Sequence, residues 1–214
     1  MFKYNLTFSK QDKAIYLSHL DTMRTFQRAF KRAGLPVYHT QGFNPHPYIS
    51  ISVPLSLGFS SLCETLDFAL DVPLTIDMAG MLNQALPDGI RVLCVNLGAT
   101  KPGDIEFSKY LISLQGEKLP DGDAVTKLLL NPETQVLKRS KKGEEMVSIC
   151  QFLQPPKIIC TDQNQLDMEI LLKAGSVSMN PSYIITAIKA SGVQVEDWQV
   201  CRMGLVYKNK EAGA

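Results

Sequence analysis

Two periodic patterns recur along the sequence in a regular order, and this order limits the possible folds more than any single residue does. Apolar residues at every second position indicate half-buried strands, whereas apolar residues three or four positions apart indicate an amphipathic helix. Residues 2–8 and 64–72 show the first pattern, and residues 18–34 show the second. When the extra pairing around residues 37–53 is set aside, the first half predicts the order strand, helix, strand, strand, helix and strand.

The second half repeats this order more faintly. In the first half we predict strands at residues 2–8, 14–17, 37–40, 48–53, 64–72 and 90–97, and helices at residues 18–34 and 75–86. In the second half we predict strands at residues 107–114, 134–139, 145–153, 157–160, 166–174 and 193–207, and helices at residues 121–130 and 183–190.

A linker separates the two halves, because residues 98–104 hold two Gly, one Pro and few apolar groups. The repeated order is that of the split βαβ motif. We therefore predict an α+β protein of two tandem ferredoxin-like (βαββαβ) units with antiparallel sheets. The N-terminal unit is expected at residues 1–98 and the C-terminal unit at residues 105–210.

The helix predicted at residues 18–34 has signals at both ends. Ser18 can cap the first turn, Asp21 completes a variant capping box, and Gly34 stands where a left-handed residue ends a helix. The face opposite the apolar one carries Arg24, Arg28, Lys31 and Arg32. Since a helical turn rises ~5.4 Å, these side chains can follow successive phosphates of a nucleic acid. The alternative is an ordinary solvated face.

The loop at residues 41–48 combines residue types that recognise single-stranded nucleic acids. Gln41 and Asn44 offer paired donors and acceptors, and aromatic rings can stack on an unpaired base. Two prolines hold the segment in a pre-organised shape. The predicted substrate-binding residues are Arg24, Arg28, Gln41, Phe43, Asn44, His46 and Tyr48. The alternative is a rigid turn in which Phe43 packs inward and Asn44 caps backbone groups.

All three histidines, His19, His39 and His46, lie within residues 18–52. Imidazole can act as both acid and base, so His19 and His46 are candidate catalytic residues. A metal site formed by the histidines stays an alternative, although their spacing is loose. Helical projection puts His19 nearer the apolar side, which favours a structural role. The sequence lacks the motifs G-x-S-x-G, G-x-G-x-x-G, H-E-x-x-H and the P-loop. Hydrolases with a nucleophile elbow, nucleotide-binding enzymes and zincins therefore lack their defining residues here.

Cysteine spacing bears on cofactors. The five cysteines are far apart, and none forms a C-x-x-C pair. This spacing predicts reduced thiols and excludes a local three-cysteine cluster motif or zinc knuckle. We therefore expect no metal or cofactor bound by this chain, and any iron–sulfur cluster to come from a partner.

Charge and hydropathy point to a cytoplasmic protein with a positive side. Net charge is +1, but Lys and Arg predominate in residues 1–60, whereas Asp and Glu predominate in residues 61–100. This asymmetry is consistent with an anionic ligand. No apolar run approaches the ~20 residues of a membrane span, and the first residues lack the features of a signal peptide. We expect no membrane association.

Three stretches carry a family resemblance: residues 17–24 have the sequence LSHLDTMR, residues 33–36 AGLP and residues 41–47 QGFNPHP. The chain closely resembles a family of uncharacterised bacterial proteins, a domain of unknown function, that occur fused to or encoded beside radical S-adenosylmethionine (radical SAM) enzymes. The resemblance is specific over residues 1–72. It implies an accessory, substrate-handling subunit whose partner, a radical SAM enzyme, carries an iron–sulfur cluster and S-adenosylmethionine.

A looser similarity connects the paired units and the N-terminal histidine with CRISPR repeat-processing RAMP-type endoribonucleases, which need no metal. Their glycine-rich C-terminal loop is missing here, since residues 202–205 contain one glycine.

The expected function is therefore binding of RNA or another anionic substrate and its presentation to a partner radical SAM enzyme, without catalysis by this chain alone. One alternative is a metal-independent RNA-processing enzyme, a ribonuclease or hydrolase, that uses His19 and His46. Another is a protein-interaction adaptor that binds no nucleic acid.

Overall fold

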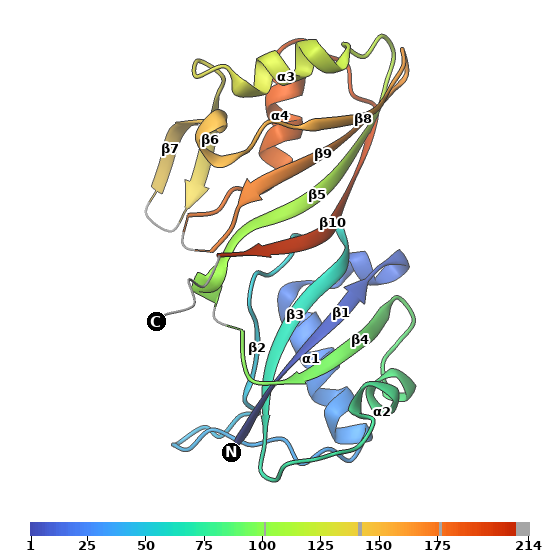
Figure 1. The fold of residues 1–214 in the computed structure, drawn as a ribbon, viewed down its shortest axis with the longest axis vertical. Coiled ribbons are helices and arrows are strands. Elements are labelled where there is room, and N and C mark those ends of the chain that lie inside the picture. Colours follow the sequence, from blue (N-terminus) through green and yellow to red (C-terminus); the bar gives the residue numbers. More distant parts are fainter. Residues whose placement is uncertain (101, 141–142, 176, 209–214) are drawn as a thin grey trace, which may run out of the picture. The chain divides into compact units, whose positions relative to one another are not determined.

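The structure is a computed structural model that describes residues 1–100, 102–140, 143–175 and 177–208. The chain divides into two compact units, unit 1 (Met1–Asp104) and unit 2 (Ile105–Ala214). Each unit combines antiparallel strands with two α-helices in its described part (Figure 1). The predicted α+β class is confirmed.

Unit 1 is built from a four-stranded antiparallel sheet and two helices. Its elements are β1 (Phe2–Lys10), α1 (His19–Arg32), β2 (Ile49–Ile51), β3 (Ser60–Leu70), α2 (Met78–Ala85) and β4 (Ile90–Leu97), with a short 3-10 turn, η1 (Asp12–Tyr16), before α1. β1 lies between β4 and β3, and β2 pairs with the other edge of β3. The strand order in this unit is therefore β4-β1-β3-β2.

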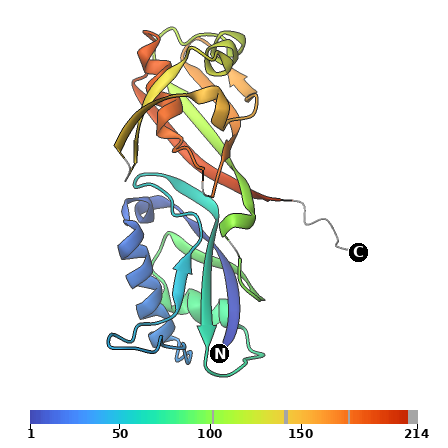
Figure 2. The ribbon, with the colours of Figure 1, turned by 90° about the vertical axis from the view of Figure 1, so that its left-hand side faces the viewer.

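The core of unit 1 lies between the helices and one face of this sheet (Figure 2). Alternation along β1 turns Tyr4, Leu6 and Phe8 toward the helices, where Phe26 and Phe30 of α1 meet them. The rings of Phe8 and Phe26 lie 4.7 Å apart between centroids and meet edge to face. This packing fixes one face of α1 against the sheet and leaves the opposite face to solvent.

Unit 2 repeats the arrangement with an added hairpin. Its elements are β5 (Ile105–Gln115), α3 (Gly122–Leu130), β6 (Gln135–Ser140), β7 (Gly143–Ser148), β8 (Lys157–Thr161), β9 (Gln165–Lys173), α4 (Ser182–Ala190) and β10 (Asp197–Tyr207). β5 lies between β10 and β9, and β8 pairs with the other edge of β9. The strands β6 and β7 pair only with each other among the described residues.

The second helix begins later than the sequence predicts. The sequence predicts a helix at residues 75–86, but α2 starts at Met78, after Asp77. The Asp77 carboxylate accepts a hydrogen bond from the backbone N–H of Gly80 at 2.9 Å. Asp is an effective N-cap, and its position nearer the apolar residues Met78 and Leu82 decides where the helix begins.

The strand expected at residues 37–40 is reduced to isolated bridges, and the strand expected at residues 48–53 is shortened to β2. Val37 pairs with Leu70, and His39 pairs with Pro47. Because proline has no N–H to donate, Pro47 interrupts the ladder between the two segments. The chain between α1 and β2 is therefore mostly loop.

None of the helices in the described part of the chain has the length and apolar character needed to cross a membrane.

Candidate nucleic-acid interface

Helix α1 is capped as the sequence predicts. The backbone N–H of Asp21 donates to the Ser18 hydroxyl at 3.1 Å, and that hydroxyl donates to the Asp21 carboxylate at 2.7 Å. The hydrogen bond from Ser18 holds the pKa of Asp21 below its usual value. After the last turn, Gly34 has a φ of +66°, the left-handed conformation that ends a helix at low cost for glycine.

The exposed face of α1 carries the predicted basic side chains. We call Arg24, Arg28, Lys31 and Arg32 the basic stripe; all are exposed, and the buried face consists of Thr22, Phe26, Ala29 and Phe30. Arg24 forms an exposed ion pair with Asp21 at 3.4 Å, and Arg32 donates to the carbonyl oxygen of Ala85 on α2. Solvent screens an exposed ion pair of this kind, so the pair contributes little to stability and Arg24 can exchange its partner for a ligand.

The loop at residues 41–48, the recognition loop, is closed by backbone hydrogen bonds at its base. The N–H of Thr40 donates to the carbonyl oxygen of His46 at 2.9 Å, and the N–H of Tyr48 donates to the carbonyl oxygen of Tyr38 at 2.8 Å. Phe43 lies near the tip, with a relative exposure of 106%. Phe43 does not pack inward, so the rigid-turn alternative does not hold for this residue.

The other predicted binding residues in the loop differ in accessibility. Gln41, Asn44 and His46 are exposed, and Tyr48 is half-buried. The ammonium of Lys3 lies 5.8 Å from the centroid of the Tyr48 ring, within range of a cation–π contact. Tyr48 therefore packs partly against β1 and offers less free surface than Phe43.

His46 helps to shape the loop. Its Nδ1 lies 3.0 Å from the Thr40 hydroxyl and 3.1 Å from the carbonyl oxygen of Asn44. Its backbone N–H also donates to the Thr40 hydroxyl at 3.2 Å. These contacts hold the loop narrow while the His46 side chain stays exposed.

The structure does not bring His19 and His46 together. His19 begins α1, whose 14 residues span about 20 Å. The recognition loop follows the other end of the helix, where Val37 pairs with Leu70, and lies at the end of unit 1 that holds the N terminus (Figure 1). The geometry therefore does not support one acid–base pair or one metal site containing both. Among the described residues, no group of three or more His, Cys, Asp and Glu side chains is arranged to hold a metal ion.

Two charged residues near His19 are not predicted as site residues by the sequence. Lys10 and Glu64 are 3% and 2% exposed, and both line a narrow hollow that His19 and Thr22 complete. They come near each other because Glu64 on β3 pairs in register with Phe8, two residues before Lys10 on β1. The unusual feature is burial of both charges, which local sequence does not reveal.

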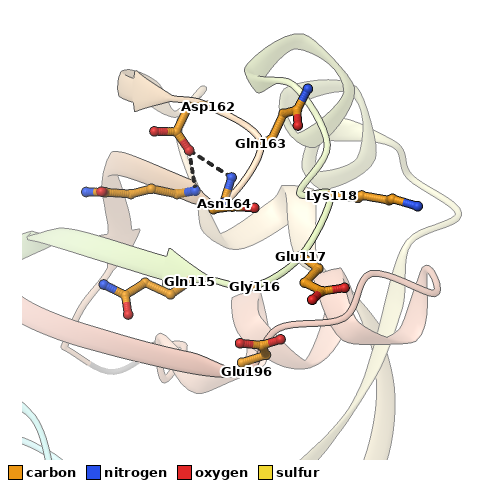
Figure 3. A pocket seen from close by; sticks show the side chains of 9 residues that line it. Gln115, Gly116, Glu117, Lys118, Asp162, Gln163, Asn164 and Glu196 are labelled. Atoms are coloured by element: carbon orange, nitrogen blue, oxygen red, sulfur yellow. Dashed lines mark hydrogen bonds between the residues drawn. The ribbon is translucent and has the colours of Figure 1, made fainter.

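Unit 2 has an open pocket of about 830 Å³ where β5, β9 and β10 begin or end (Figure 3). Its lining includes the acidic residues Glu117, Asp162 and Glu196 beside a single Lys118. Asp162 already accepts hydrogen bonds from the backbone N–H groups of Asn164 and Gln165, at 2.8 and 2.7 Å. The acidic side chains disfavour an anionic ligand, so this pocket is not part of the interface.

These features define a two-unit α+β protein with a candidate ligand-binding surface on its first unit. Residues 3–181 match the model of the family described as "Uncharacterized protein conserved in bacteria (DUF2344)", and the chain belongs to this family. The predicted membership of an uncharacterised bacterial family is confirmed to this extent. No curated protein matches the sequence.

A solved structure shares the fold at low identity. A chain in the crystal structure of a Cbf5-Nop10-Gar1 complex is similar over 97% of this chain, with a TM-score of 0.52 and 11% identity. The present chain spans 50% of that chain's length. A structure of an unknown protein from Galdieria sulphuraria covers 93% of this chain and is itself covered over 98% of its length, at 13% identity and a TM-score of 0.27. The first similarity concerns the fold alone, and the second supports no argument.

Proposed function

We propose that the protein binds RNA, or another anionic substrate, through unit 1 and presents it to a partner enzyme of the radical SAM class. The observation that carries this proposal is the fully exposed ring of Phe43 on a hydrogen-bonded loop that follows the basic helix α1. On its own the chain is a binding subunit.

The exposed ring of Phe43 is available for contact with a ligand. Burying a phenylalanine side chain contributes ~1.5–3 kcal/mol to folding, and this loop forgoes that contribution. Stacking of a base on an exposed aromatic ring contributes ~1–3 kcal/mol to binding and tolerates any sequence. Since hydrogen bonds already close the loop, the loop needs little additional ordering when a nucleobase stacks on Phe43.

The basic stripe supplies the charge that a nucleic-acid backbone needs. In the described part of the chain, neither Arg28 nor Lys31 has a side-chain hydrogen bond or ion pair. Residues one turn apart on a helix lie ~5.4 Å apart along its axis, a spacing suited to successive phosphates. The stripe and the recognition loop together favour a flexible single strand, which can place its phosphates on α1 and a base on Phe43.

We also propose that both units are ferredoxin-like. This is supported by the antiparallel strand orders β4-β1-β3-β2 and β10-β5-β9-β8, each with helices in the βαββαβ sequence. The hairpin of β6 and β7 is then an insertion in unit 2.

The radical SAM partner rests on the resemblance of residues 17–24, 33–36 and 41–47. In this proposal the partner carries the iron–sulfur cluster and S-adenosylmethionine, and the present chain brings the substrate. The alternative of a ribonuclease that uses His19 and His46 together lacks geometric support, because the two imidazoles lie at opposite ends of unit 1. A protein-interaction adaptor is the remaining alternative.

Purification of the tagged full chain from its native cells tests the proposal. We expect RNA and a radical SAM enzyme to be retained, and RNA to be released by raising the salt concentration because phosphate contacts are salt-dependent. An untagged chain is the control. Retention of proteins without any nucleic acid or other anionic substrate would favour the adaptor, and absence of a radical SAM enzyme would remove the proposed partner.

A further inference from the structure

A hollow under the first turn of α1 lies at the opposite end of that helix from the recognition loop. Its polar lining comes from Lys10, His19, Thr22 and Glu64, and its apolar lining includes Pro54 and Leu55. The hollow has a volume of about 10 Å³, which is room for about one water-sized atom. A ligand would therefore enter it with a single oxygen atom.

Lys10 provides the hydrogen-bond donor. Its ammonium donates to the carbonyl oxygen of Leu17 at 2.8 Å, the one acceptor it has among the described residues. Burial lowers the pKa of Lys10, and the nearby Glu64 carboxylate opposes this shift. An ammonium has three N–H donors, so two are left for other oxygen atoms.

The charges select a neutral oxygen. Because Glu64 already lies beside the ammonium, an entering phosphate or carboxylate would meet a like charge as well as an opposite one. A carbonyl oxygen accepts from the ammonium without that repulsion. Uracil, guanine and cytosine each carry a carbonyl oxygen, whereas adenine carries none.

We propose that this hollow is a second contact point for the strand bound along α1, and that it receives the carbonyl oxygen of a terminal base. The inference rests on the proposed function. The basic stripe runs along α1 on the face opposite Thr22, so a strand that follows the stripe has to cross the exposed first turn at His19 to place its terminal base in the hollow. His19 is exposed beside the hollow and can contact the same base.

A base preference at one end of an oligonucleotide tests this inference. We compare oligoadenosine of about eight nucleotides with the same strand carrying one uridine at the 5′ or the 3′ end, by fluorescence anisotropy. We expect wild-type protein to bind one of the two uridine-ended strands about tenfold more tightly than it binds oligoadenosine. This factor is the effect of one hydrogen bond to a charged donor. Lys10→Met should abolish this preference, and Lys13→Met, an exposed neighbour in η1, should keep it.

A second variant covers the risk that Lys10→Met fails to fold. His19→Ala removes an exposed side chain and should reduce the same preference. If wild-type protein binds all three strands but shows no preference for uridine at either end, or if both variants keep the preference, the inference is overturned while the proposed function stands. If wild-type protein binds no oligonucleotide at low salt, both are overturned.

Discussion

Replacing Phe43 by alanine weakens the binding of single-stranded RNA by about tenfold or more, and leaves the free energy of unfolding unchanged. The loss follows from the ~1–3 kcal/mol that a stacked base contributes. Stability is unaffected because the side chain, with a relative exposure of 106%, makes no packing contact that alanine would lose. Fluorescence anisotropy with labelled oligouridine gives the affinity, and denaturant unfolding gives the stability.

Two matched variants define the role of the ring. Phe43→Tyr keeps an aromatic face and should bind as wild type does. Ile159→Ala shortens another exposed apolar side chain, on β8 of unit 2, and should have no effect on affinity. Unchanged binding by Phe43→Ala, or an equal loss in Ile159→Ala, would contradict the stacking role.

Replacing both Arg24 and Arg28 by glutamine lowers RNA affinity and also changes its dependence on salt. Each phosphate contact to a single strand contributes ~0.7 to the slope of log affinity against log salt, so loss of two contacts reduces that slope by about 1.4. Glutamine keeps the helix propensity of arginine. The Arg24–Asp21 ion pair that is lost is exposed and screened by solvent, so its loss should have little effect on stability.

Arg91→Gln is the control for this double variant. Arg91 is exposed on β4 of unit 1 and is not part of the basic stripe. Its replacement lowers the net charge but should leave the salt slope within error of wild type. Equal slopes for wild-type protein and the double variant would show that α1 does not contact phosphates.

Elements with local signals were predictable from the sequence. β4 was expected at residues 90–97, and the structure has Ile90–Leu97. α1 lies between the Ser18 cap and Gly34, because a side-chain oxygen and a left-handed glycine act within one turn of each helix end. Alternation and capping depend on neighbouring residues, which a single sequence contains.

Features that depend on distant residues were not predictable. The burial of Lys10 near Glu64 requires the register that pairs Phe8 with Glu64, and no local pattern sets that register. The residue types of the recognition loop could be found, but the sequence was equally consistent with Phe43 inside or outside. In the structure, hydrogen bonds at Thr40 and Tyr48 close the loop, and Phe43 lies outside.

The separation of the histidines has the same cause. His19 and His46 are close in sequence, and a loop of that length could have returned either to the start or to the end of α1. Pairing of Tyr38 and Tyr48 with Ala69 holds the loop at the far end of β3. The chain therefore offers two separate surfaces where the sequence indicated one.

Ultraviolet cross-linking of the full chain to oligouridine, followed by mass spectrometry of the attached peptides, tests the central claim most directly. Binding by stacking on Phe43 and by phosphate contacts along α1 predicts cross-links in residues 19–48, with Phe43 itself the main attachment point and loss of that cross-link in Phe43→Ala. Cross-links confined to residues outside 19–48, or none at concentrations where anisotropy shows binding, would contradict it.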